Sequence, residues 1–117
     1  MLFDIGANLT HSDFKDDLQA VLDRAKTAGV LQMTVTGASL EGSKQAVALS
    51  EQFEGLFATV GVHPHHAEEL NDDTLQLLAA LAESPRVVAI GETGLDYFRD
   101  FTPRDQQRRA FEAQLAL

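Results

Sequence analysis

The sequence predicts an α/β fold made of four successive βα units around a parallel sheet. Four short apolar runs, rich in β-branched and aromatic residues, alternate with four helical patterns. The runs begin every ~25–30 residues, a period typical of βα units joined by right-handed crossovers. Together, the alternation and the period favour a parallel sheet over an all-helical or all-β fold.

The four predicted strands are each about five residues long and apolar enough to be buried on both faces. Glycine follows closely after each of them, which is typical of a chain that turns sharply out of a sheet. The predicted strands cover residues 1–5, 31–35, 56–60 and 86–90.

The first two predicted helices have apolar residues at helical spacing and clear end signals. The first covers residues 16–28 and ends at Gly29, which stands where a C-terminal cap belongs. The second covers residues 41–54, with Ser39 as its predicted N-cap and Gly55 after its end.

The last two predicted helices are bounded by proline. One covers residues 71–83 and is ended by Ser84-Pro85. The other begins at Thr102-Pro103, with threonine as the N-cap and proline in the first helical position, and continues through Phe111 and Leu115.

Two architectures fit four βα units, a small open sheet and half of a TIM barrel, whose eight units need ~250 residues. The sequence stops inside the last predicted helix without a cap or turn signal. This favours the half barrel. We therefore expect residues 1–117 to form the N-terminal half of a single TIM-barrel domain, truncated at about half.

Composition excludes several classes of protein. The chain has no cysteine, so disulfides and thiolate metal sites are excluded. Its net charge of -9 argues against a nucleic-acid binder with a broad basic surface, but not against a metal-dependent phosphodiesterase, in which cations meet the phosphate. No signal peptide or membrane-length apolar run is present, so we expect a cytoplasmic protein without membrane contact.

Polar residues collect after the predicted strands, where parallel α/β folds place their functional residues. Glu92 directly follows Ile90-Gly91 and is the best candidate for a metal ligand, the alternative being a structural ion pair or loop hydrogen bond. His63 is the predicted pocket residue after the third strand. Asp4 is a candidate ligand or a support for one, and Asp96 either joins the site or accepts N–H groups within its own turn.

The other histidines are expected on the surface. His65 and His66 adjoin a charged stretch, and Ser12 and Asp13 follow His11.

Three segments resemble, in order, the signatures of TatD-type deoxyribonucleases: Phe3-Asp4-Ile5-Gly6-Ala7-Asn8-Leu9-Thr10, Val60-Gly61-Val62-His63-Pro64-His65 and Gly91-Glu92-Thr93-Gly94-Leu95-Asp96-Tyr97. The resemblance implies a TIM barrel of the amidohydrolase type, a divalent metal site with Glu92 as a ligand, and hydrolysis of phosphodiester bonds. Two histidines and an aspartate, which complete the ligand set in the family, would lie beyond Leu117.

One position departs from many members of that family. They carry a His-x-His pair after the first aspartate, where this sequence has Gly6 and Asn8. A branch of the family has this Gly-x-Asn form, so the departure does not affect family membership. It affects the binding of metal by residues of the first strand.

The leading hypothesis is therefore a metal-dependent nuclease acting on DNA or RNA, inactive as the 117-residue chain alone. The metal is Mg²⁺, Mn²⁺ or Zn²⁺. Asn8 and His63 are expected to line the pocket, with Asp4 and Asp96 in supporting roles. The alternatives are an amidohydrolase acting on amides or esters and a non-catalytic fragment or interaction module. Besides nucleic acid, the expected partner is a missing C-terminal half or a second copy, bound through the exposed sheet edges.

Overall fold

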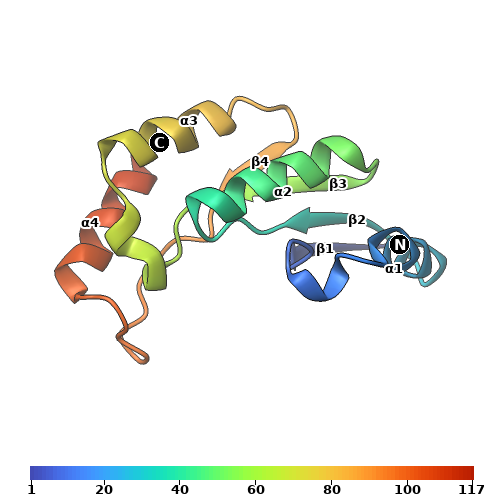
Figure 1. Ribbon diagram of the computed structural model, residues 1–117, viewed down its shortest axis with the longest axis horizontal. Coiled ribbons are helices and arrows are strands. Elements are labelled where there is room, and N and C mark those ends of the chain that lie inside the picture. Colours follow the sequence, from blue (N-terminus) through green and yellow to red (C-terminus); the bar gives the residue numbers. More distant parts are fainter.

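The computed structural model describes residues 1–117 and contains one parallel sheet of four strands (Figure 1). The strands lie in chain order, β1-β2-β3-β4, and every neighbouring pair is parallel. An open doubly wound sheet reverses its strand order at a switch point, whereas a barrel does not. The order therefore confirms four successive βα units of a TIM barrel. The strands are β1 (Leu2–Ala7), β2 (Val30–Val35), β3 (Leu56–Val60) and β4 (Val87–Ile90).

The helices follow the strands as predicted, with short 3₁₀ turns η1 (Ser12–Phe14) and η2 (Pro64–Glu69) as additions. The predicted ends are within a few residues of the observed ones. Ser39 caps α2 by accepting a hydrogen bond from the backbone N–H of Gly42, and Gly29 follows α1 with a φ of 94°. The α-helices are α1 (Leu18–Thr27), α2 (Leu40–Gln52), α3 (Asp72–Leu81) and α4 (Arg104–Leu115).

The start of α4 differs from the prediction. Pro103 is the N-cap, and the Thr102 hydroxyl instead donates to the backbone oxygen of His65 at 3.1 Å. The apolar residues that predicted this helix also do not form its buried face, because Leu115 is exposed. At Thr102, a contact with a distant loop has replaced the local cap.

The hydrophobic core lies between the central strands and the helices that cover them, chiefly α2. Leu56, Ala58 and Val60 are the buried residues of β3 and alternate along it with less buried ones, as period-two patterning requires, and Val35 of β2 is fully buried beside them. Leu78 of α3 closes the core from the far side of α2. The buried cluster consists of Ala7, Leu9, Met33, Val35, Ala46, Val47, Leu56, Ala58, Val60, Val62 and Leu78.

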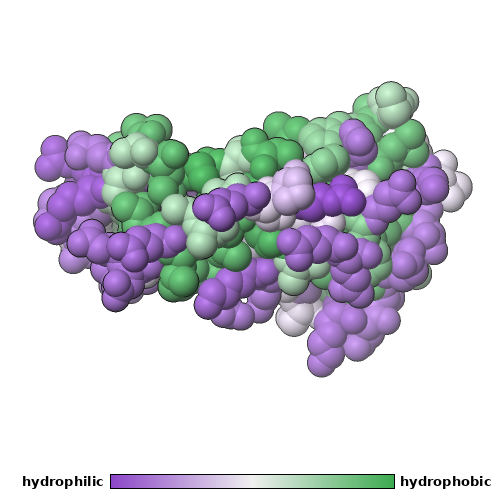
Figure 2. Space-filling model, turned by 90° about the horizontal axis from the view of Figure 1, so that it is seen from above, coloured by the Kyte–Doolittle hydropathy of each residue, from purple (hydrophilic) through white to green (hydrophobic).

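The outer strands are not buried, contrary to the prediction for β1 and β4. Ile5 is 78% exposed, and Leu2, Phe3 and Val88 are also exposed. Each outer strand has one unpaired edge, and Figure 2 shows hydrophobic residues reaching the surface between hydrophilic ones. None of the helices has the length and hydrophobicity that a membrane span requires.

Candidate functional site

The carboxyl ends of β2, β3 and β4 approach one another closely, and glycine makes this approach possible. A Cβ at Gly37 would lie 2.5 Å from the backbone oxygen of Thr59, and one at Gly61 would lie 2.7 Å from the backbone of Gly91. The Gly37 carbonyl accepts a hydrogen bond from the backbone N–H of Glu92 at 2.6 Å. The glycines after these strands therefore bring the Glu92 loop against its neighbours.

Two buried side chains hold the residues that precede His63. The Ser43 hydroxyl accepts from the Gly61 N–H at 3.0 Å and donates to the Gly61 oxygen at 3.2 Å. The Gln114 side chain accepts from the Val62 N–H at 2.8 Å and donates to the Val62 oxygen at 3.1 Å. Helices α2 and α4 thus fix two consecutive residues at both of their backbone polar groups.

These constraints bring together His63 and Glu92, the two residues that the sequence favoured most. The Nε2 atom of His63 lies 3.4 Å from Oε1 of Glu92, and the Glu92 side chain is 53% exposed. The Nδ1 atom of His63 accepts a hydrogen bond from the backbone N–H of His65 at 3.0 Å. The proton of the neutral ring therefore belongs on Nε2, which makes this atom a donor.

The pKa of His63 is lowered below its ordinary value. Burial of the ring is the main cause, and it outweighs the opposing effect of the Glu92 carboxylate. At neutral pH the ring is thus a neutral hydrogen-bond donor toward Glu92 or an anionic ligand. A metal-binding histidine usually donates from its other nitrogen, whereas Nδ1 of His63 accepts. His63 therefore fits a substrate-contacting group better than a metal ligand.

Glu92 has the chemistry of a metal ligand. Its carboxylate has no lysine or arginine within ion-pair distance, and the one ring nitrogen that it contacts belongs to His63, which is neutral. The hydroxyl of Thr93, the next residue, is buried without a hydrogen-bond partner. Carboxylate oxygen suits Mg²⁺, Mn²⁺ and Zn²⁺. Glu92 therefore fits one position of a metal shell. The shell is incomplete in this chain, because no group of three or more His, Asp or Glu side chains comes together.

His65 belongs to the site, contrary to the prediction that it lies on the surface. Its Nε2 atom is 2.7 Å from Oδ2 of Asp96, and its side chain is 22% exposed. Its ring packs against His63, with centroids 4.2 Å apart, and against Phe101 at 4.8 Å. The surface prediction was wrong because the loop after β4 folds over His65, a long-range contact that local sequence does not reveal.

Asp96 combines the two roles that its sequence left open. One carboxylate oxygen accepts from the backbone N–H of Arg99 at 3.0 Å, closing a local turn, while the other contacts His65. The pKa of Asp96 is lowered below its ordinary value by the Arg99 N–H and then by the His65 side chain. A contact within the turn and a contact between two loops therefore share one carboxylate.

This arrangement predicts how Asp96 titrates. The folded pKa lies below that of an unfolded aspartate, about 3.9. The stabilisation is therefore fully present above that pH and is lost as the pH falls through the folded pKa. An NMR titration of the Asp96 carboxyl carbon should show the lowered midpoint, and His65→Ala should raise it. A midpoint at or above the ordinary aspartate value, or one unchanged in His65→Ala, would contradict the assigned contacts.

The side chains of the remaining predicted residues form no hydrogen bond or ion pair with this group. Asp4 accepts from the backbone N–H of Gly6 at 3.0 Å, and both Asp4 and Asn8 are exposed. Neither forms a hydrogen bond or ion pair with His63 or Glu92, so their roles stay predictions. His66 and His11 are exposed, which confirms that both lie on the surface.

Sequence reasoning missed Ser43, Gln107 and Gln114, whose side chains hold the loops of the site. Glutamine on a helix is ordinarily a solvated residue, so neither one stands out locally. The spacing of seven residues places both on one face of α4, and this was the signal available in the sequence.

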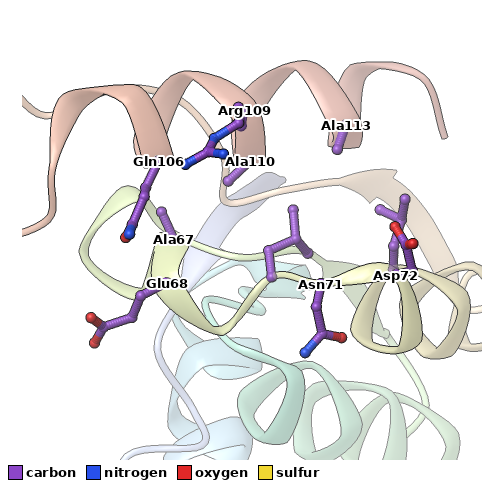
Figure 3. Close-up of a pocket in the computed structure, with 10 residues that line it drawn as sticks. Ala67, Glu68, Asn71, Asp72, Gln106, Arg109, Ala110 and Ala113 are labelled. Carbon is purple, nitrogen blue, oxygen red and sulfur yellow. The ribbon is translucent and has the colours of Figure 1, made fainter.

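The structure also contains a cavity away from the site. It has a volume of about 320 Å³ and lies between α4 on one side and the end of η2 with the start of α3 on the other (Figure 3). Asn71, Gln106 and Arg109 are among its lining residues, and neither Glu92 nor His63 reaches it. The cavity therefore separates two packed elements and is no part of the candidate site.

Comparison with known proteins gives one consistent family. A model of the family described as TatD related DNase matches residues 3–117. The chain is 50% identical over 117 residues to the "3'-5' ssDNA/RNA exonuclease TatD" of Erwinia tasmaniensis. The aligned region covers 99% of this chain and 45% of that protein. It is 47% identical over 116 residues to the exonuclease of the same name from Cronobacter sakazakii.

Solved structures agree with the sequence relatives. The TatD homologue YJJV of Escherichia coli K12 superposes with a TM-score of 0.89 at 32% identity, over 98% of this chain and 45% of that one. An uncharacterized amidohydrolase from Saccharomyces cerevisiae gives a TM-score of 0.85 at 26% identity, over 97% and 42%. The chain thus spans about half the length of the relatives it matches.

Proposed function

The chain belongs to the TatD-related DNase family, and from this premise we propose that its full-length form is a metal-dependent exonuclease acting on single-stranded DNA or RNA. Here the full-length protein means this chain together with the rest of the domain found in its relatives. Residues 1–117 are proposed to be the N-terminal half of that single TIM-barrel hydrolase domain.

The observation that supports the proposal best is the pairing of His63 with Glu92 at the carboxyl ends of β3 and β4. A carboxylate without a cationic partner lies 3.4 Å from a neutral imidazole donor. Both groups can assist hydrolysis of a phosphodiester: the carboxylate by binding a cation, and the imidazole by donating a hydrogen bond to a phosphoryl oxygen. The related exonucleases carry names that specify such a substrate.

The proposed roles follow from the contacts. Glu92 would hold the divalent metal, proposed to be Mg²⁺, Mn²⁺ or Zn²⁺, which when bound would acidify a water molecule and polarise the phosphoryl oxygen. His63 would donate from Nε2 to the phosphate, while His65 and Asp96 would keep its ring in place. Asp4 in β1 and Asn8 directly after it would line the pocket.

A comparison of two forms of the protein tests this proposal. We expect the full-length protein to degrade single-stranded DNA or RNA with added Mg²⁺ or Mn²⁺, and the 117-residue chain to be inactive. The reason is that a stable metal site needs about three protein ligands, whereas no three candidate ligands come together in this chain.

Both forms would be purified free of host nucleases and assayed on labelled oligonucleotides and on amide and ester substrates. Hydrolysis of amides or esters alone would support the amidohydrolase alternative. Cleavage by the 117-residue chain that depends on Glu92 would mean that ligands within this segment have been overlooked.

A further inference from the structure

Helix α4 buries an unusual face. Its buried residues are Gln107, Ala110 and Gln114, which are 1%, 5% and 2% exposed. They follow one another at three- and four-residue spacing and so share one side of the helix. A helix normally buries an apolar stripe, and a buried amide is costly unless its polar atoms are paired. The partners of the two glutamines therefore indicate why they are there.

Gln114 holds the loop after β3. Its Oε1 atom accepts from the Val62 N–H at 2.8 Å, and its Nε2 atom donates to the Val62 oxygen at 3.1 Å. Val62 is 1% exposed and directly precedes His63. Both backbone groups of the residue before the candidate donor are thus fixed by one side chain from a helix more than fifty residues away.

Gln107 holds the loop after β4. Its Oε1 atom accepts from the Asp96 N–H at 2.8 Å, and its Nε2 atom donates to the Thr102 oxygen at 2.7 Å. Asp96 in turn contacts His65, and the Thr102 hydroxyl donates to the His65 oxygen. Gln107 therefore fixes two residues that contact His65: Asp96, which contacts the His65 ring, and Thr102, which binds the His65 backbone.

We propose that Gln107 and Gln114 are positioning residues, with α4 as a rigid spacer that sets the distance between the loop carrying His63 and the loop carrying Glu92. The proposal rests on the proposed function for its catalytic consequence. Neither glutamine contacts the reacting atoms. Each acts through the backbone it holds, and two helical turns between them keep the two attachment points at a constant separation.

The test uses Gln107→Met and Gln114→Met in the full-length protein. Methionine matches glutamine in length but cannot make the paired hydrogen bonds. Gln106→Met is the matched control, because Gln106 is the neighbouring glutamine on the same helix and its Oε1 atom has no partner. We expect kcat on single-stranded DNA to fall about 10- to 100-fold in each test variant, with KM within about threefold, because small misplacement of reacting groups is costly. The control should keep the wild-type kcat.

A second measurement does not depend on nuclease activity. NMR spectra of histidine-labelled full-length protein should show the ring signals of His63 displaced in Gln114→Met and those of His65 displaced in Gln107→Met. Gln106→Met should leave both unchanged. If the protein proves not to be a nuclease, these shifts still decide whether α4 positions the loops.

Melting curves separate positioning from stability. Both test variants should melt at a lower temperature yet remain folded at the assay temperature. Unchanged kcat and unchanged histidine signals in such variants would overturn the proposal, since the glutamines would then only stabilise the fold. Complete unfolding of both variants would also overturn the proposal. If the two glutamines only position the loops, their replacement should leave the sheet folded.

Discussion

Glu92→Ala in the full-length protein is expected to abolish hydrolysis while leaving the fold intact. Glu92 is the one carboxylate of the site without a cationic partner, and its side chain is half-exposed, so its loss removes a proposed metal ligand without emptying the core. Such a loss should cost several kcal/mol of transition-state stabilisation. This corresponds to a fall in rate of about 10³-fold or more. The exonuclease rate with added Mg²⁺ and the metal content by mass spectrometry would be measured together.

The matched control is Glu112→Ala, which removes an exposed glutamate of α4 that lies outside the site. It should keep the wild-type rate and metal content. Activity of Glu92→Ala within tenfold of wild type would remove Glu92 from the proposed ligand set. A loss of metal content in the Glu112 variant would show that the assay reports general destabilisation.

The second large effect concerns the chain by itself. We expect the 117-residue chain to dimerise, to bind a complementing C-terminal half or to aggregate, because β1 and β4 each leave one edge unpaired. Apolar side chains of both strands meet water, with Ile5 78% and Val88 55% exposed. The net charge of -9 opposes association but is screened within about 8 Å at physiological salt.

Light scattering from micromolar to millimolar concentration measures this association. Ile5→Lys places a charge on the exposed edge strand and should reduce association. Gln45→Lys adds the same charge to an exposed position of α2 and should leave it unchanged. A sharply melting monomer over the whole concentration range would mean that the open sheet is a complete small fold.

Local patterns were sufficient for the elements and for the first members of the site. Strand β3 was predicted with its observed ends, and Ser39 caps α2 as its sequence indicated. These features depend on neighbouring residues, which a sequence displays directly. Glu92 and His63 could be selected because strand ends of a parallel sheet meet at one edge, and the structure places them 3.4 Å apart.

Contacts between loops, in contrast, were decided by the tertiary structure alone. His65 is within the site because the segment after β4 folds over it, and Thr102 gives its hydroxyl to that same loop instead of capping α4. The buried face of α4 carries Gln107 and Gln114, whose amides pair with the backbones of the loops after β3 and β4.

The exposure of β1 and β4 has the same origin. Their sequences are apolar on both faces, as barrel strands are, but burial depends on which other segments cover a strand. The sequence by itself therefore determined which segments become strands and helices and which residues end them. The tertiary structure decided which side chains meet across loops and which strands remain in water. Both depend on the positions of segments that are distant in the sequence.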